Sequence, residues 1–201
     1  MKKNNKGFSL IEIVVVLAIM GVIAAFLTPM LFNYMSDSKL RRAQSDVQNI
    51  AAAINRFNTD TGVYPVYTDK PLQKAKASVK VLVTNGNDAE ATGFTTWNET
   101  WSTNSYLQSH LEKGLIKDGV SYSEAVQNPN KWAGPYMTDF KADSWGNRYY
   151  VSTEGFTPGS SKAAFVLSAG PNGAIDTVLS QESGTSSAFA VGGDDIAYRI
   201  K

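Results

Sequence analysis

The first 60 residues carry two hydrophobic patterns in succession. From Ile13 to Leu27 no side chain is polar, and the apolar stretch continues to Phe32. As a helix, these about 20 residues cover roughly 30 Å, the hydrocarbon thickness of a bilayer. After Pro29, apolar residues recur every three or four positions, which predicts a helix with one apolar face. The residues on that face are Leu40, Ala43, Val47, Ile50, Ile54 and Phe57.

Together the two patterns predict one long helix from about Phe8 to about Phe57. Its first part, 8–32, is apolar all round and is expected to lie in a membrane or a filament core, whereas 33–58 is expected to pack on a globular head. Pro29 lacks a backbone donor and is expected to kink or loosen the helix. Turn-forming residues over 58–62 are expected to end it.

Residues 59–201 are enough for one domain with a single core. Short apolar runs between Gly, Ser and Pro predict strands in its last third, so an α+β fold is expected, with a small antiparallel sheet leaning on the long helix. The expected strands are 148–152 and 163–168, with 188–191 and 196–200 as edge strands.

The segment 66–130 is less regular and is treated as an insertion in the head. Residues 80–83 are expected to form either a short strand or the end of a helix, and 106–115 a short helix. Trp97 and Trp101 could form an exposed recognition patch, but aromatic side chains of this kind more often pack against a sheet.

Glu12 is a carboxyl group near the start of the apolar segment. Twelve Leu, Ile, Val and Phe residues contribute about −4 to −7 kcal/mol to insertion, against about 3 kcal/mol for one central charge. The segment should therefore insert. A cleaved secretory signal would need a small-residue cleavage site, for which Ala24-Ala25-Phe26 is a poor match. A plain membrane anchor would leave Glu12 unexplained, since intramembrane carboxylates are normally paired.

Basic residues flank the apolar segment on both sides. Those before it favour a cytoplasmic N-terminus, and those after it oppose that bias, so charge leaves the orientation open. The flanking residues are Lys2, Lys3 and Lys6 on one side and Lys39, Arg41 and Arg42 on the other.

The run Gly7-Phe8-Ser9-Leu10-Ile11-Glu12 resembles the processing site of type IV pilins and type II secretion pseudopilins. The resemblance implies that residues 1–7 are a leader, that prepilin peptidase cuts between Gly7 and Phe8, and that Phe8 becomes the methylated N-terminus. It also implies that Glu12 pairs with the terminal amine of a neighbouring subunit. An unpaired charge in a low dielectric is costly, so such a pair would set the register of assembly.

Further motifs extend this resemblance over about 1–65 and 131–201, most closely to the major pseudopilin. Ser144 stands where that family usually has Pro, and the segment between these regions has no match. The matching motifs are Gly21, Pro29, Tyr64-Pro65, Trp132-Ala133-Gly134-Pro135-Tyr136, Asp143-Ser144-Trp145-Gly146-Asn147, Ser168-Ala169-Gly170-Pro171-Asn172-Gly173 and Gly192-Gly193-Asp194-Asp195-Ile196.

In major pseudopilins the C-terminal loop binds calcium, and the resemblance implies a Ca²⁺ site here. The strongest expected ligands are Asp194 and Asp195, with Asp176 and Asn172 beside them, because hard cations prefer oxygen ligands from a flexible loop. A Ser-rich stretch interrupts the family spacing. The alternative is a polar surface loop whose Asn and Asp residues form turns.

The amino-acid composition excludes several further classes of function. The chain has no Cys and one His, which excludes cysteine nucleophiles, thiolate metal sites and disulfides. His110 is expected to be a surface or cap residue rather than a catalyst. No nucleophile-elbow or phosphate-binding motif occurs, and a net charge of +1 gives no basic footprint for nucleic acid.

We therefore expect a structural subunit and no enzymatic activity. The resemblance implies a single-pass protein of the bacterial inner membrane with its N-terminus in the cytoplasm and its head in the periplasm, which then joins a periplasmic or extracellular filament. Implied partners are further copies of the chain, minor pseudopilins or pilins, prepilin peptidase and an inner-membrane assembly platform. The alternatives are a pilin of a surface pilus, serving adhesion, motility or DNA uptake, and a membrane-anchored periplasmic binding protein or enzyme.

Overall fold

The computed structural model of the chain describes residue 7 and residues 9–66, 79–84, 107–114, 122, 132–184 and 189–201. It divides into two compact units, Met1–Lys39 and Leu40–Lys201. The elements in chain order are α1 (Leu10–Thr61), β1 (Val81–Val83), α2 (Leu107–Leu111), β2 (Tyr150–Ser152), the 3-10 turn η3 (Glu154–Phe156), β3 (Phe165–Ser168) and β4 (Ile196–Arg199). Trp97, Trp101 and most of the segment 66–130 lie outside the described residues.

The long helix expected from the two hydrophobic patterns is present as α1, which has 52 residues and begins and ends slightly later than expected. Gly62 ends it: its N–H donates the last helical bond, to the carbonyl oxygen of Asn58 at 2.8 Å, and its positive φ of 71° then turns the chain out of the helix. The helix runs through Pro29. This proline therefore does not end the helix, and a kink there stays a prediction.

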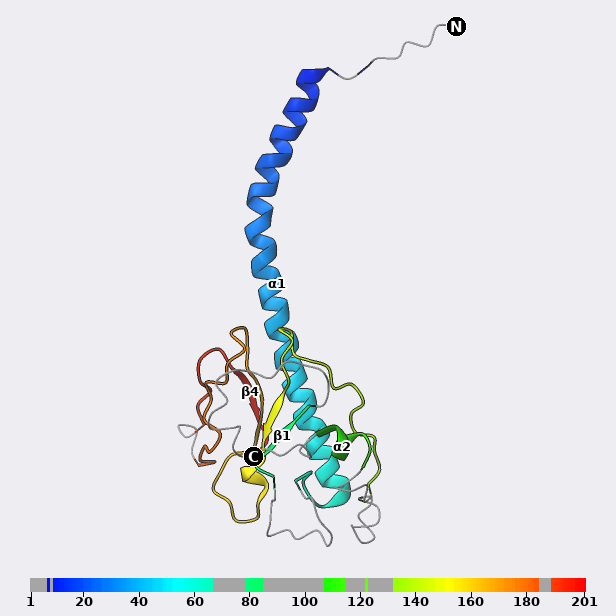
Figure 1. Cartoon of the computed structure of the whole chain (residues 1–201), viewed down its shortest axis with the longest axis vertical. Helices are drawn as coiled ribbons and strands as arrows, with labels where there is room; N and C mark the ends of the chain where they lie inside the picture. Colours follow the sequence, from blue (N-terminus) through cyan, green and yellow to red (C-terminus); the bar gives the residue numbers. More distant parts are fainter. Residues whose placement is uncertain are drawn as a thin grey trace, which may run out of the picture. The chain divides into compact units, whose positions relative to one another are not determined.

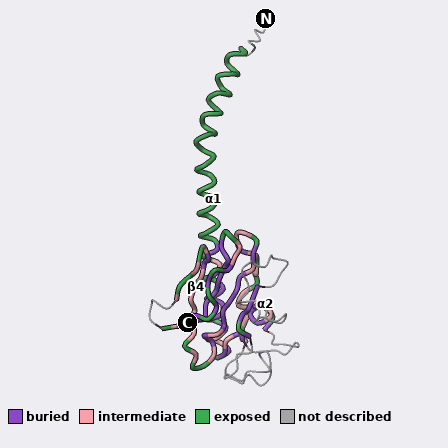
Figure 2. The backbone as a smooth tube through the Cα atoms, turned by 60° about the vertical axis from the view of Figure 1, so that its left-hand side comes forward, coloured by how far each residue is buried: buried purple, intermediate pink, exposed green. Residues whose placement is uncertain are grey.

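In the first unit, every described side chain from Ser9 to Lys39 is exposed, and Figure 2 shows this part of α1 in the exposed colour along its length. By length and composition α1 can cross a membrane. Thr28, a polar residue within the apolar segment, donates its hydroxyl hydrogen to the carbonyl oxygen of Ala24 at 2.7 Å. Its polarity is therefore satisfied inside the helix, where no other partner would be available in lipid.

The second unit contains a four-stranded antiparallel sheet with the strands in sequence order, β1-β2-β3-β4 (Figure 1). The registers pair Leu82 with Val151, Val151 with Val166, and Val166 with Tyr198. The expected α+β class is confirmed: the long helix packs on a small antiparallel sheet.

The sheet is buried on both faces, which explains why β1, β2 and β3 are buried throughout rather than at alternate residues. Leu82, Val151 and Val166 belong to the same core cluster as the apolar face of α1. The opposite face packs against the C-terminal segment. It is formed by Val81, Val83, Tyr150, Phe165 and Leu167, covered by Ile175, Leu179 and Phe189.

The expected apolar face of α1 is confirmed with one exception. Ala43, Val47, Ile50, Ile54 and Phe57 are buried, but Leu40 is 37% exposed. Periodicity places Leu40 on the same stripe, yet the head buries the side chains of α1 fully only from Ala43 onward.

The smaller elements differ in detail from their expected bounds. Residues 81–83 form a strand rather than a helix end, and 150–152, 165–168 and 196–199 are shorter than expected. The expected edge strand 188–191 is wrong over its described residues 189–191, which form no strand. Gln181 instead holds this segment, because its amide group bonds both the N–H and the carbonyl oxygen of Ala190, at 2.7 and 2.8 Å.

His110 was expected at the surface and is buried instead. It lies on α2 between Leu107 and Leu111, and all three side chains face the core. One ring nitrogen, Nδ1, lies 2.7 Å from the hydroxyl of Tyr122. Burial lowers the pKa of His110 from its ordinary value of 6.5 to about 4. The three-residue spacing from Leu107 was the sequence signal for burial, and the polarity of His concealed it.

This burial predicts a pH dependence of folding stability. The unfolded chain takes up a proton on His110 below about pH 6.5, whereas the folded head does so only near pH 4, so stability is fully present above 6.5 and falls as the pH drops. We expect the full-length protein in detergent to lose about 1.5 kcal/mol of unfolding free energy between pH 6.5 and pH 5, measured by denaturant titration.

Since the chain has one His, the substitution His110→Gln isolates the effect. The variant should show a nearly flat stability over the same pH range. An equally steep loss in the variant would assign the pH dependence to other groups.

Candidate functional site

The processing region lies at the beginning of α1. Gly7 is exposed and precedes the helix, and Phe8 lies outside the described residues. A Cβ atom added at Gly7 would meet nothing within 4 Å. The fold of the subunit therefore does not require glycine at this position, and any requirement must come from a molecule that acts on the chain.

Glu12 lies in the first turn of α1 and is exposed. Its backbone N–H donates to the carbonyl oxygen of Ser9 at 3.1 Å, which places the carboxyl group at the N-terminal end of the helix. The helix dipole favours a negative charge there. Gly21, nine residues after Glu12 on the same helix, also has open space around it. Neither residue has a packing role within the described part of the chain.

The C-terminal loop brings together the residues that the sequence proposed as metal ligands. Asn172 donates its backbone N–H to Asp194 Oδ2 at 3.0 Å and its side-chain amide to Asp176 Oδ2 at 3.2 Å. Asp195 Oδ2 accepts the N–H groups of Asp176 and Thr177 at 3.0 and 2.7 Å. The four predicted residues are therefore neighbours, although Asp176 and Asp194 are 18 positions apart in the sequence.

Glycines allow this close approach. A Cβ atom at Gly170 would lie 2.2 Å from the carbonyl oxygen of Asp194, and one at Gly193 would lie 2.0 Å from Asp176 Oδ2. Both glycines have positive φ angles, 64° and 51°. The Gly-rich flanks noted in the sequence thus have a steric reason, which is to let the two halves of the loop touch.

Two carboxyl oxygens in this loop are buried without a hydrogen-bond partner among the described residues, Asp194 Oδ1 and Asp195 Oδ1. Burial raises the pKa of Asp195, while the two N–H donors oppose that shift. Such oxygens fit a hard cation. However, no group of three or more acidic or His side chains in the described residues is placed to hold a metal. Backbone and amide oxygens would have to supply most of the remaining ligands.

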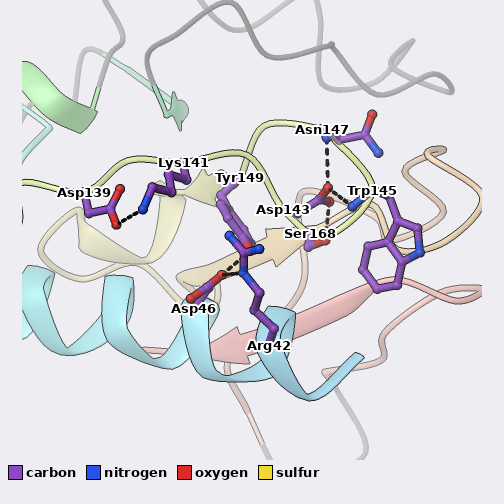
Figure 3. Close-up of polar contacts among 9 residues, drawn as sticks. All are labelled: Arg42, Asp46, Asp139, Lys141, Asp143, Trp145, Asn147, Tyr149 and Ser168. Carbon is purple, nitrogen blue, oxygen red and sulfur yellow. Dashed lines mark hydrogen bonds and ion pairs between the residues drawn. The ribbon is translucent and has the colours of Figure 1, made fainter. Parts of the chain in front are cut away.

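A turn held by the buried Asp143 adjoins the loop, and its role was not expected from the sequence. Asp143 Oδ1 accepts the N–H groups of Trp145 and Asn147 at 3.0 and 2.8 Å, and Asp143 Oδ2 accepts the hydroxyl of Ser168 at 2.7 Å (Figure 3). The Ser168 hydroxyl in turn accepts the N–H of Gly170 at 3.3 Å. Asp143 therefore ties the turn 143–147 to the end of β3 and to the start of the loop.

From the sequence, Asp143 was expected only as part of a family motif. The signal that could have found its role is the Asp followed by Gly-Asn, since Asp side chains commonly bind backbone N–H groups two residues on. Its partner Ser168 could not be found this way, because the two residues are 25 positions apart in the sequence.

A second polar contact joins α1 to the sheet. Tyr149 donates its hydroxyl to Asp46 Oδ2 at 2.9 Å, and Arg42 Nε lies 3.6 Å from the same oxygen (Figure 3). Burial and the neighbouring Asp46 raise the pKa of Tyr149. These residues line a groove of about 450 Å³ together with the exposed ion pair of Lys141 with Asp139, at 2.9 Å. Its charges are thus already matched within the subunit, which favours a structural role.

Two comparisons decide the family. The prokaryotic N-terminal methylation motif matches residues 2–28, the region that contains Gly7, Phe8 and Glu12. Prepilin peptidase-dependent protein A of Clostridium perfringens is 33% identical over 132 residues, which cover 65% of this chain and 84% of that protein. This chain belongs to the type IV pilin and pseudopilin family. The resemblance drawn from the sequence motifs is thereby confirmed.

Other members of the family have the name type II secretion system core protein G. That of Escherichia coli K12 is 26% identical over 174 residues, 87% of this chain and 87% of that protein. That of Pseudomonas aeruginosa is 36% identical over 64 residues, 32% of this chain. The match spans 45% of the Pseudomonas protein, about half of its length. No solved structure matches the chain.

Proposed function

We propose that this pilin-like protein is a pseudopilin of a type II secretion system, a structural subunit that polymerises into a filament. The observation that carries the proposal is the match to core protein G over 87% of both chains, which includes the head as well as the N-terminal helix. The methylation motif alone would be shared by every member of the family. The match over the head therefore favours a type II secretion pseudopilin over other members of the family.

Assembly would follow from the chemistry of the first turn of α1. Cleavage after Gly7 removes Lys2, Lys3 and Lys6 and exposes a new amine on Phe8. A subunit entering the filament would place that amine against Glu12 of a neighbour, and the ion pair would neutralise two charges that are costly in an apolar core. The apolar residues of α1 would then exchange lipid for other helices.

The N-terminus of the mature protein tests this function. Mass spectrometry of the protein from its native cell should show a chain that begins at methylated Phe8. A membrane-anchored periplasmic binding protein or enzyme, the alternative from a different class, would keep residues 1–7 or lose a longer segment. An N-terminus other than methylated Phe8 would therefore count against a filament subunit of any kind.

A type IV pilin of a surface pilus is the second candidate. The fimbrial protein EcpC of Eikenella corrodens is 34% identical over 65 residues, which cover 32% of this chain. Electron microscopy and secretion assays of a deletion strain separate the two. Intact surface pili with lost protein secretion support the pseudopilin, whereas lost surface pili with normal secretion would support the pilin.

The proposed partners follow from this function. They are further copies of this chain, minor pseudopilins, prepilin peptidase and an inner-membrane assembly platform. The proposed location is the inner membrane, with the N-terminus in the cytoplasm and the head in the periplasm, before the subunit enters a filament. Nothing in this arrangement requires enzymatic activity of the subunit.

We also propose that the C-terminal loop binds Ca²⁺. Asp194 and Asp195 would supply the carboxyl oxygens that have no hydrogen-bond partner, and Asp176 and Asn172 lie beside them. The ion would neutralise carboxyl groups that the fold brings together and would hold the two halves of the loop in place.

Calcium is therefore expected to stabilise the folded protein. At a calcium concentration about 100 times the dissociation constant, the stabilisation is about 2.7 kcal/mol, which is measurable as a rise in the melting temperature of the full-length protein. Asp194→Asn and Asp195→Asn should reduce the rise, whereas Asp139→Asn, on the exposed Lys141 pair, should not. No shift of the melting temperature at millimolar calcium would remove the proposal.

A further inference from the structure

The basic residues that follow the apolar part of α1 stand at a specific height relative to a bilayer. The apolar part ends at Phe32, and α1 continues as a helix to Thr61. At 1.5 Å per residue, Lys39 lies about 10 Å and Arg41 about 14 Å beyond Phe32 along the helix axis. The headgroup layer on each side of a bilayer is roughly 5–8 Å thick. The backbone at both cations therefore lies just outside this layer when the apolar part spans the hydrocarbon core.

Helix geometry directs these side chains toward the membrane. Every Cα–Cβ bond of a helix tilts toward the N-terminus, which here is the membrane side of Lys39 and Arg41. Their long side chains can therefore reach back to the phosphate level. Tyr34, which is 74% exposed, lies two residues after Phe32, where aromatic side chains commonly mark the interface.

The two cations lie on different sides of the helix. Lys39 and Arg41 are each about 100° away from Leu40, in opposite directions. Leu40 lines a groove with Asp194 and Asp195. Arg41 is therefore about 100° around the helix from the residue that faces this acidic part of the head. Arg41 is exposed and makes no ion pair within the described part of the chain.

Residues 37–42, called the basic band here, carry a net positive charge. Asp37 is the acidic residue within the band, and Arg42 lies 3.6 Å from Asp46, which offsets part of its charge. Lys39, Arg41 and Arg42 against Asp37 leave a net charge of +2 over residues 37–42. Leader cleavage would remove Lys2, Lys3 and Lys6, so this band would then hold the basic side chains nearest to the span.

We propose that Lys39 and Arg41 form a binding surface for anionic phospholipid headgroups, which holds the unassembled subunit in the membrane. The inference rests on the proposed membrane insertion of α1, and it does not depend on the orientation of the chain. A basic side chain near an anionic surface gains electrostatic attraction that salt screens. Entry into a filament must break these contacts, so they oppose premature release of the subunit.

The test uses full-length protein in vesicles of equimolar phosphatidylglycerol and phosphatidylcholine. Electron spin resonance of spin-labelled lipids gives the association constant of each lipid with the protein. We expect the protein to prefer phosphatidylglycerol, with a loss of about fivefold in that preference for Lys39→Gln or Arg41→Gln. High salt should weaken the preference.

Matched variants show whether charge sets the preference for phosphatidylglycerol and whether residues 37–42 carry it. Asp37→Asn should strengthen the preference, and Lys141→Gln, in the head, should leave it unchanged. An equal affinity of the wild-type protein for both lipids, or an unchanged preference in the Lys39→Gln/Arg41→Gln double variant, would overturn the proposal. So would a double variant that keeps the lipid preference but fails to assemble, because the two residues would then contact another subunit.

The outcomes also distinguish a failure of the headgroup proposal from a failure of the proposed membrane anchoring by α1. Extraction with alkaline carbonate reports whether the wild-type protein inserts at all. A protein that inserts without preferring phosphatidylglycerol contradicts the headgroup surface alone. A protein that does not insert contradicts membrane anchoring, and with it both proposals.

Discussion

Replacing Glu12 by Ala is expected to abolish filament assembly while the subunit still inserts and is still cleaved at Gly7. The exposed carboxyl group has no packing role in the described part of the chain, so its loss should leave the head folded. In a filament, however, the amine of an incoming Phe8 would be left without a partner in an apolar core, which costs several kcal/mol. Electron microscopy of filaments, with immunoblots of membranes for insertion and cleavage, measures the result.

Two control variants make the Glu12 result specific. Glu12→Gln keeps the shape and hydrogen-bonding capacity but not the charge, so it should also fail to assemble if an ion pair is required. Asp37→Ala removes another exposed acidic residue of α1 and should leave filaments intact. Normal filaments in Glu12→Ala would show that the charge has no part in assembly, whatever the family resemblance implies.

Asp143→Ala is expected to cost about 3–4 kcal/mol of unfolding free energy. The substitution removes the acceptor of three hydrogen bonds at once and leaves the N–H groups of Trp145 and Asn147 and the hydroxyl of Ser168 without that partner. Asp143 is 4% exposed, so water cannot easily replace it. Denaturant titration of the full-length protein in detergent measures the loss.

Asp139 offers a matched control on the same segment. Its side chain is 64% exposed and its partner Lys141 is 72% exposed, so Asp139→Ala should cost less than about 1 kcal/mol. Ser168→Ala should fall between the two, because it breaks only one of the Asp143 bonds. Equal effects of Asp139→Ala and Asp143→Ala would mean that the turn 143–147 does not organise this end of the sheet.

The hydrophobic pattern was sufficient for α1 because helices depend on contacts between residues close in sequence. The apolar run and the stripe from Ala43 to Phe57 gave the helix, its two halves and its buried face. Leu40 was the exception. Periodicity cannot say where along a stripe the head begins to cover it.

The strands were harder to predict because both faces of the sheet are buried. Strands that are buried at every residue, such as Phe165–Ser168, carry no alternation that would fix their ends or their neighbours. The expectation that His110 lies at the surface was wrong for a related reason. A polar side chain on an apolar face is interpreted as exposed unless its partner, here Tyr122, is known.

By itself, the sequence determined the family, the membrane helix and the residues expected to act at its beginning. These properties lie in short contiguous segments, where the order of Gly7, Phe8 and Glu12 is already the chemical information. Only the tertiary structure decided that Asp143 joins Ser168, that Tyr149 joins Asp46, and that Asp176 meets Asp195. Such pairs lie far apart in the chain, and packing of the sheet against α1 and the C-terminal segment brings them within hydrogen-bonding distance.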